Sequence, residues 1–303
     1  MTAGAVDQDD ATTATDAQVA ASRLRWWREL LYVAVFYAVY SSVRNLFGSQ
    51  GTGEDIDASV AFEHARQIID IQRAMGLYFE AELQRWYLDL PAMGLIRVWN
   101  IFYGTAHFVV TAGALVWLYR SDKARYPRWR NTLLVTTAVA IVGFASYSLM
   151  PPRLLDDPGK YGACRIYAPE AAFTAEPGDK SVEGCDRYGF VDTLAVHGGW
   201  ISLDDEKAAG LTNQYAAMPS MHIGWSVWSA LVLVPMMRRR WTRALAWSYP
   251  FLTLFTIMVT ANHYWIDAVG GLVALGFGAL VARWLTARFQ SRQARGDLPI
   301  TTA

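Results

Sequence analysis

Six apolar runs of about 20 residues constrain this chain more than any other feature of its sequence. A helix of that length crosses the hydrocarbon core of a membrane. The runs lie at 26–47, 92–119, 131–150, 221–237, 244–261 and 264–285. The third run contains no charged residue, whereas the first carries Arg44 near its end. The sequence therefore predicts an all-α polytopic membrane protein with a bundle of six transmembrane helices.

Composition supports this fold class and argues against a nucleic-acid partner. Hydrophobic residues make up 53% of the chain and charged residues only 18%, which is too apolar for an ordinary soluble surface. The 27 basic and 27 acidic residues cancel, so there is no excess of positive charge for nucleic acid. We expect membrane lipids to surround the chain and no nucleic acid to bind it.

The polar segments between the runs predict the domain organisation. Residues 1–22 are polar and lack a signal-peptide pattern, so we expect a disordered cytoplasmic tail followed by a membrane-embedded domain over 23–287. Within that domain, 58–90 mixes apolar and charged residues and predicts amphipathic interfacial helices. The connection 151–219 is long enough to fold as an extracytoplasmic loop, and 288–303 is a second cytoplasmic tail.

Basic residues predict the orientation, because cytoplasmic connections of membrane proteins carry an excess of Lys and Arg. Most of the 27 basic residues fall in four short segments that would share one side: Arg23, Arg25, Arg28; Arg120, Lys123, Arg125, Arg128, Arg130; Arg238, Arg239, Arg240, Arg243; and Arg283, Arg288, Arg292, Arg295. We therefore expect an integral protein of the plasma membrane with both termini cytoplasmic. The connections 58–90 and 151–219 would face outside, where an oxidising compartment permits a disulfide between Cys164 and Cys185, although two unpaired thiols fit the sequence as well.

Two motifs place histidines at the outer ends of predicted helices. In AAMPSMHIGW, Pro219 suits the first helical position, and Ser220 and His222 would lie in the first turn, where free backbone N–H groups bind anions. A capping serine beside a structural histidine is the alternative. In TANHYWIDAVGG, His263 and Asp267 are four residues apart and share a helical face, so the carboxylate can orient the imidazole. A structural hydrogen bond between helices is the alternative for Asp267.

A third motif, SYSLMPPRLLDD, places Arg153 just beyond the third run. The planar guanidinium of arginine matches phosphate oxygens, although an interfacial arginine near the lipid headgroups fits equally well. In the six-helix arrangement Arg153, His222 and His263 come from distant segments but face the same side at similar depth. The three motifs therefore predict one phosphate site at the outer face.

Together, PPR, PSMH and HYWID resemble the type 2 phosphatidic acid phosphatase superfamily, and especially its inositol phosphorylceramide synthase branch, over roughly 92–285. The resemblance implies metal-independent phosphoester chemistry without a cofactor, on a lipid phosphate or phospholipid. It further implies that His263 is the nucleophile, that Asp267 orients it and that His222 protonates the leaving oxygen. Ser220 and Arg153 would hold the phosphate.

Three departures distinguish the chain from the phosphatases of that superfamily. Ile257 stands where they carry an Arg six residues before the nucleophile, PSMH replaces PSGH, and the first motif is reduced to PPR. The inositolphosphotransferase-like branch shows similar departures, which favours that branch over a typical lipid phosphatase. Either water or an alcohol, such as inositol or another polyol, can accept the phosphoryl group.

Further polar residues are candidates for the substrate pocket: Tyr103, His107, Asn213, Gln214 and Tyr215. A packed, hydrogen-bonded histidine within the second run is the alternative for His107. Two other functions fit the same residues. His222, His263 and Asp267 would suit a two-His-one-carboxylate metal protein, and a non-enzymatic lipid or solute transporter would use Asp267 as a coupling site.

Overall fold

A computed structural model describes residues 58–91, 95–169, 184–199 and 213–294, together with single residues between 25 and 42. Within these ranges the chain is all-α and forms no sheet. One isolated parallel β-bridge joins Leu149 to Ala216. Two sequence expectations, the first apolar run (26–47) and the tail 1–22, lie largely or wholly outside the described residues.

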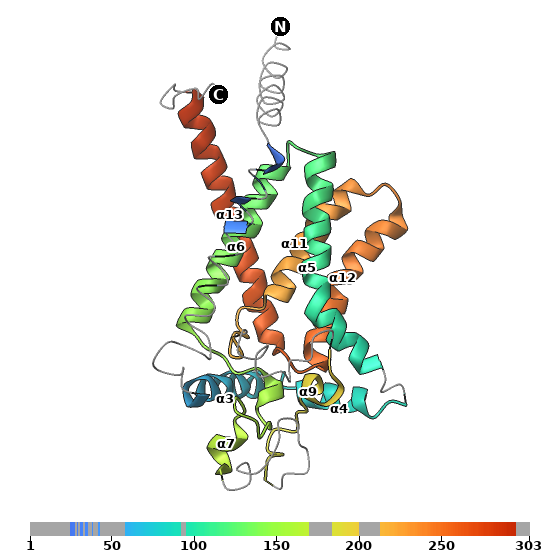
Figure 1. Cartoon of the computed structure of the whole chain (residues 1–303), viewed down its shortest axis with the longest axis vertical. Coiled ribbons are helices and arrows are strands. Elements are labelled where there is room, and N and C mark those ends of the chain that lie inside the picture. Colours follow the sequence, from blue (N-terminus) through green and yellow to red (C-terminus); the bar gives the residue numbers. More distant parts are fainter. Residues whose placement is uncertain are drawn as a thin grey trace.

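Long helices run side by side along the long axis of the molecule (Figure 1). They are α5 (Leu95–Ser121), α6 (Tyr126–Ser146), α11 (Met221–Leu233), α12 (Arg240–Val259) and α13 (Trp265–Ala294). The 3-10 helix η2 (Val234–Met236) follows α11 directly. These helices coincide with five of the six apolar runs of the sequence.

Short helices lie across one end of this bundle. α3 (Ala58–Ala74), α4 (Glu80–Leu88) and α9 (Thr193–His197) are grouped there, with α7 (Cys164–Tyr167) beyond them (Figure 1). The 3-10 helix η1 (Pro152–Leu154) follows the end of α6. A core of apolar side chains, including Phe62, Ile69, Leu155 and Tyr264, joins α3 to the start of α13.

Two of the described helices are long and apolar enough to cross a membrane, Leu95–Ser121 and Trp265–Arg288. Both expose large apolar side chains on their outer surfaces, among them Val109 (68% exposed) on α5 and Val273 (67%) on α13. α12 does the same with Phe251 (71%). Exposed apolar surface on several neighbouring helices is costly in water and is typical of a protein surrounded by lipid.

Two helices end at other positions than the apolar runs that contain them. The third apolar run extends to residue 150, but α6 ends at Ser146, because Leu149 leaves the helix and donates its backbone N–H to the carbonyl of Tyr215 (2.8 Å). The last run ends at residue 285, but α13 continues to Ala294, and the start of the cytoplasmic tail at residue 288 stays a prediction. Apolarity marks the membrane-spanning part of a helix and does not mark where its backbone hydrogen bonds end.

Close contacts between α13 and its neighbours depend on glycine. A side chain at Gly271 would place its Cβ 2.2 Å from the carbonyl oxygen of Ser220, and one at Gly278 would lie 2.3 Å from the hydroxyl of Thr136 on α6. Small residues of this kind let helix backbones approach closely in membrane proteins. They hold α13, which begins two residues after His263, against α6 and α11.

Candidate active site

Backbone hydrogen bonds join the three motifs that the sequence analysis selected. The N–H of Arg153 donates to the carbonyl of Ala261 (2.7 Å), two residues before His263. The N–H of Ser220 donates to the carbonyl of Asp267 (2.9 Å). Because these are main-chain contacts, the relative positions of Arg153, His222 and His263 are set by the fold itself.

His263 and Asp267 form a buried hydrogen-bonded pair at the start of α13. The distance between His263 Nδ1 and Asp267 Oδ2 is 3.2 Å, and the same carboxylate oxygen accepts the backbone N–H of Tyr264 (3.0 Å). His263 is 3% exposed and Asp267 is fully buried. A carboxylate only accepts hydrogen bonds, so Nδ1 carries the proton and Nε2 carries a free lone pair.

The Nε2 lone pair of His263 is directed at His222. The distance from His263 Nε2 to His222 Nδ1 is 3.3 Å, and His222 Nε2 lies 3.2 Å from the carbonyl oxygen of Tyr103. His222 thus has a hydrogen-bond acceptor on each side of its ring. An imidazole whose two ring nitrogens both lie within hydrogen-bonding distance of another polar atom can accept or give up a proton.

The pair of histidines lines a cavity of about 240 Å³. Its polar lining includes Arg153, Asn213, Gln214 and Asn262, with Arg153 hydrogen-bonded to Gln214. Its apolar lining includes Phe108 of α5, Phe144 of α6, and Met221 and Trp225 of α11, which lie together because Trp225 packs with Phe144 and Met221 and its ring contacts that of Phe108. A ligand with a polar head and an apolar body matches this division.

A third histidine, His107, lies in the same cavity. Its ring is 4.2 Å from the ring of His222, centroid to centroid, and its Nδ1 is 3.0 Å from the carbonyl of Tyr103. The Tyr103 ring stacks on His222 at 4.2 Å. Tyr103 and His107 are therefore placed at the cavity, as the sequence predicts, and both fix the position of His222.

Arg153 is held at the cavity by two side chains. Its Nη1 lies 2.5 Å from Asp192 Oδ2, and its Nη2 lies 2.5 Å from Gln214 Oε1. Asp192 is the N-cap of α9 and also accepts the backbone N–H groups of Leu194 and Ala195. Arg153 is thus a buried, paired arginine, and the alternative of an interfacial arginine reaching toward lipid headgroups is wrong. Sequence reasoning missed Asp192, because nothing in the sequence relates it to Arg153.

Three residues lie elsewhere in the structure than the sequence predicts. Pro219 does not begin a helix: α11 starts at Met221 with Ser220 as the N-cap, because the Ser220 N–H is bound by Asp267. Ser220 is fully buried and does not line the cavity. Tyr215 also lies outside the cavity, since its hydroxyl donates to the carbonyl of Tyr161 (3.1 Å).

Glu80 supports the site from α4 and was missed by the sequence analysis. Its side chain is fully buried, although glutamate is almost never buried without partners. One carboxylate oxygen accepts from Gln72 (2.5 Å) and from the backbone N–H of Trp265 (3.1 Å), the first residue of α13. Glu80 therefore fixes the beginning of the helix that carries Asp267. Its negative charge also favours the positive end of the helix dipole.

The histidines and Asp267 lie in a row, which does not suit a metal centre. His263 uses one ring nitrogen toward Asp267 and the other toward His222, so the three groups do not point to one shared position. No group of three His, Cys, Asp or Glu in the described ranges is arranged to hold a metal ion. This geometry does not favour the two-His-one-carboxylate alternative.

A family model described as the PAP2 superfamily matches residues 66–281, which is more than half of the chain. The chain belongs to the PAP2 superfamily. The match covers α5, α6, α11 and α12, most of α3 and α13, and all the residues of the row formed by His222, His263 and Asp267. No curated protein and no solved structure matches the chain. Membership in the PAP2 superfamily indicates phosphatase or phosphotransferase chemistry, and the long apolar helices indicate a membrane protein.

Ile257 is one of the positions at which this PAP2 superfamily member departs from the phosphatase pattern. Ile257, where the phosphatases carry an Arg, is fully buried in an apolar cluster with Ile223 and Met258. Among the described residues that line the cavity, Arg153 is the only Lys or Arg. The described part of the cavity therefore presents one fixed cation.

Proposed function

We propose that this protein is an integral-membrane enzyme that transfers or hydrolyses the phosphoester group of a lipid without a metal ion. The observation that carries the proposal is the row Asp267, His263, His222, which ends in a cavity with both a polar and an apolar lining. A histidine with a free lone pair, oriented by a carboxylate, is a suitable nucleophile, and a second histidine beside it is a suitable acid.

The chemistry proceeds in two displacements. His263 Nε2 attacks phosphorus, the bond from phosphorus to the lipid oxygen breaks, and His222 gives its proton to that oxygen. Water or an alcohol then attacks phosphorus, returns a proton to His222, and the phosphorus–nitrogen bond breaks. Because His263 Nε2 faces His222 at 3.3 Å, the two rings must separate as the phosphoryl group enters between them. Arg153 stabilises the charge on the phosphoryl oxygens.

The apolar lining of the cavity supports a lipid as the substrate. Phe108 both lines the cavity and is 47% exposed on the outer surface of α5, where apolar side chains face lipid. A lipid phosphate can then place its head beside His263 while its chain remains in contact with the membrane. The acceptor fits the polar lining, and the departures at Ile257 and PPR favour inositol or another polyol as the acceptor.

We also propose a six-helix topology with both termini cytoplasmic and the site at the outer face of the plasma membrane. Trp265 at the start of α13 contacts Glu80 of α4, and Arg153 contacts Asp192, the N-cap of α9, so the site lies at the end of the bundle where α3, α4 and α9 are grouped (Figure 1). Arginines gather at helix ends distant from it, at the starts of α6 and α12 and in the last part of α13. This distribution follows the positive-inside rule.

Turnover of labelled lipid phosphates by the purified full-length protein tests the function. After exhaustive chelation, the parent should still act on the lipid, and His263→Ala should lose activity by at least about 1,000-fold, as expected for removal of a nucleophile. His197→Ala, a histidine of α9 outside the cavity, serves as the control and should retain activity. A new phosphodiester in the presence of inositol indicates transfer, and inorganic phosphate alone indicates hydrolysis. Activity that chelation abolishes and a divalent ion restores would contradict the proposal.

A further inference from the structure

A second cavity, of about 140 Å³, lies apart from the candidate active site and is lined mainly by charged residues. Three of its lining residues are arginines, Arg66 and Arg73 of α3 and Arg187 of the segment after the second cysteine. Asp70, Ile69 and Tyr188 complete the lining, and none of these residues lines the cavity beside His263. We call this second cavity the arginine pocket.

The arginines of the pocket are held in place by aromatic rings. The guanidinium of Arg73 lies 4.9 Å from the centre of the Tyr78 ring, and that of Arg187 lies 5.7 Å from Tyr167 and 5.8 Å from Tyr188. Such contacts orient the plane of a guanidinium and leave its edge N–H groups available to a ligand. Arg66 contacts Glu63 (2.8 Å) in a pair that is about half exposed on both sides.

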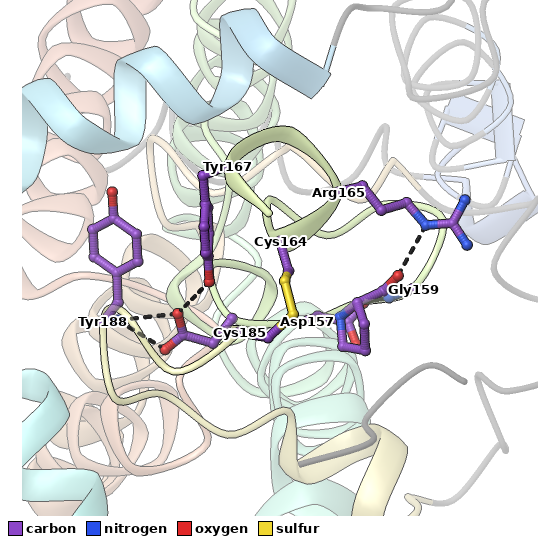
Figure 2. Close-up of a disulfide and its surroundings, with 9 residues drawn as sticks. Asp157, Gly159, Cys164, Arg165, Tyr167, Cys185 and Tyr188 are labelled. Carbon is purple, nitrogen blue, oxygen red and sulfur yellow. Dashed lines mark hydrogen bonds between the residues drawn. A yellow bond between two sulfur atoms is a disulfide. The ribbon is translucent and has the colours of Figure 1, made fainter. Parts of the chain in front are cut away.

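The segment that carries Arg187 is fixed by covalent and polar bonds. Cys185 forms a disulfide with Cys164, and the two Cα atoms are 5.3 Å apart (Figure 2). The buried Asp156 accepts the backbone N–H groups of Tyr188 (3.0 Å) and Phe190 (3.0 Å) and the hydroxyl of Tyr167 (2.9 Å). Burial raises the pKa of Asp156, and these hydrogen bonds oppose the rise by favouring its charged form.

Positive charge exceeds negative charge in the arginine pocket. Among the described residues, three arginines and one acid, Asp70, line the cavity, and Arg66 also pairs with Glu63. Burial raises the pKa of the Tyr188 phenol, as does Asp156, while Arg187, Arg66 and Arg73 act to lower it. The arginines therefore leave an excess of positive charge at the pocket, which favours an anion such as phosphate.

The surroundings of α3 indicate a water-soluble ligand. Exposed apolar residues Val60, Ile71 and Met75 form one stripe along α3, at the spacing of a single helical face. Arg66 and Arg73 are two turns apart and lie on a different face, nearly opposite to that stripe. If the apolar stripe faces lipid, the arginine pocket faces water.

We propose that the arginine pocket binds the phosphate group of a water-soluble compound, either free phosphate or a phosphate monoester. The forked N–H groups of arginine match the oxygens of phosphate, and three arginine side chains from two separate segments line this one cavity. This binding needs no turnover at His263.

Equilibrium dialysis of the full-length, detergent-purified protein against labelled inorganic phosphate tests this inference. Arg73→Gln and Arg187→Gln should each bind one phosphate fewer per chain than the parent, or bind it at least tenfold more weakly. Arg97→Gln is the matched control, because Arg97 is an exposed arginine of α5 outside both cavities. The same differences should persist in a His263→Ala background, so a failure of the proposed catalysis does not obscure the result.

Displacement of the bound phosphate by competing compounds then shows whether the ligand of the pocket is a soluble phosphate compound or a phospholipid. Glycerol phosphate should displace it, and micellar phosphatidic acid should do so less effectively. Equal phosphate binding in the parent, Arg73→Gln and Arg187→Gln would overturn the site. Displacement by phosphatidic acid alone would overturn the assignment to a soluble ligand. Since Arg73 and Arg187 belong to different segments, either variant decides the outcome if the other is poorly folded.

Discussion

At the scale of single residues, the site depends on a carboxylate that the ligand never touches. Glu80 is buried beneath the start of α13 and accepts a hydrogen bond from the backbone N–H of Trp265, two residues after His263. It does not line the cavity. We therefore regard Glu80 as a positioning residue for His263 and Asp267, in contrast to Arg153, which faces the cavity directly.

Glu80→Gln tests this positioning role. The amide has one accepting oxygen where the carboxylate has two, so it cannot keep both the hydrogen bonds from Gln72 and Trp265 and the one from the backbone N–H of Phe79 (3.1 Å), and the start of α13 is less firmly placed. We expect kcat to fall by about tenfold with little change in KM, because small displacements of reacting groups slow the chemical step. Glu82→Gln is the matched control, since Glu82 is an exposed residue of the same helix. Equal kcat values for the two variants would refute the role.

Sequence reasoning found the residues whose spacing along the chain is informative and missed those that depend on tertiary contacts. His263 and Asp267 were identifiable because they are four residues apart at a helix start. Glu80 and Asp192 were not, because each acts on a residue more than 35 positions away in the chain. Tyr215 was expected at the cavity from its place before PSMH, but the chain turns there, and the Tyr215 hydroxyl donates to the carbonyl of Tyr161 instead.

At the scale of helices, the site depends on how closely α13 approaches α11. Gly271 of α13 lies against Ser220, the N-cap of α11, and the Ser220 N–H donates to the carbonyl of Asp267. The same junction therefore joins the two helices that carry His222 and Asp267. Apolar periodicity predicted that these helices exist, but it carried no information on which faces meet.

Gly271→Ala should disturb this junction. The new Cβ would lie 2.2 Å from the Ser220 carbonyl oxygen, so the two helices must move apart, at a cost of about 1–3 kcal/mol. We expect a lower melting temperature in detergent and reduced turnover. Gly276→Ala on the same helix meets nothing within 4 Å and should be neutral or slightly stabilising. Thermal unfolding of the two variants checks this, and a Gly271→Ala protein as stable as Gly276→Ala would contradict the packing described.

At the scale of the whole molecule, the two ends of the bundle differ in chemistry. The end with α3, α4, α7 and α9 carries the site, the arginine pocket and the disulfide of Cys164 and Cys185 (Figures 1 and 2). Helix ends distant from it carry runs of arginine, such as 238–240. Both the disulfide and the arginine distribution fit a site that faces an oxidising, extracytoplasmic compartment.

Removal of the disulfide should loosen that end without abolishing turnover. Cys164 and Cys185 are 21 residues apart, and closing a loop of this size stabilises a fold by about 3 kcal/mol. The double variant Cys164→Ser/Cys185→Ser should melt at a lower temperature and bind phosphate more weakly at the arginine pocket, because Arg187 is no longer fixed. Intact mass before and after reduction of the parent confirms the bond, and a parent whose melting temperature is insensitive to reductant would contradict its stabilising role.

The central claim is that His263 becomes phosphorylated during turnover, and rapid quenching with a lipid carrying labelled phosphate tests it most directly. The parent should carry label on the peptide that contains His263, in a bond that acid breaks and alkali preserves, within a single turnover and in the presence of chelator. His263→Ala should carry none. Turnover of the lipid with no label on His263 at any quench time, or undiminished turnover by a folded His263→Ala protein, would contradict the account.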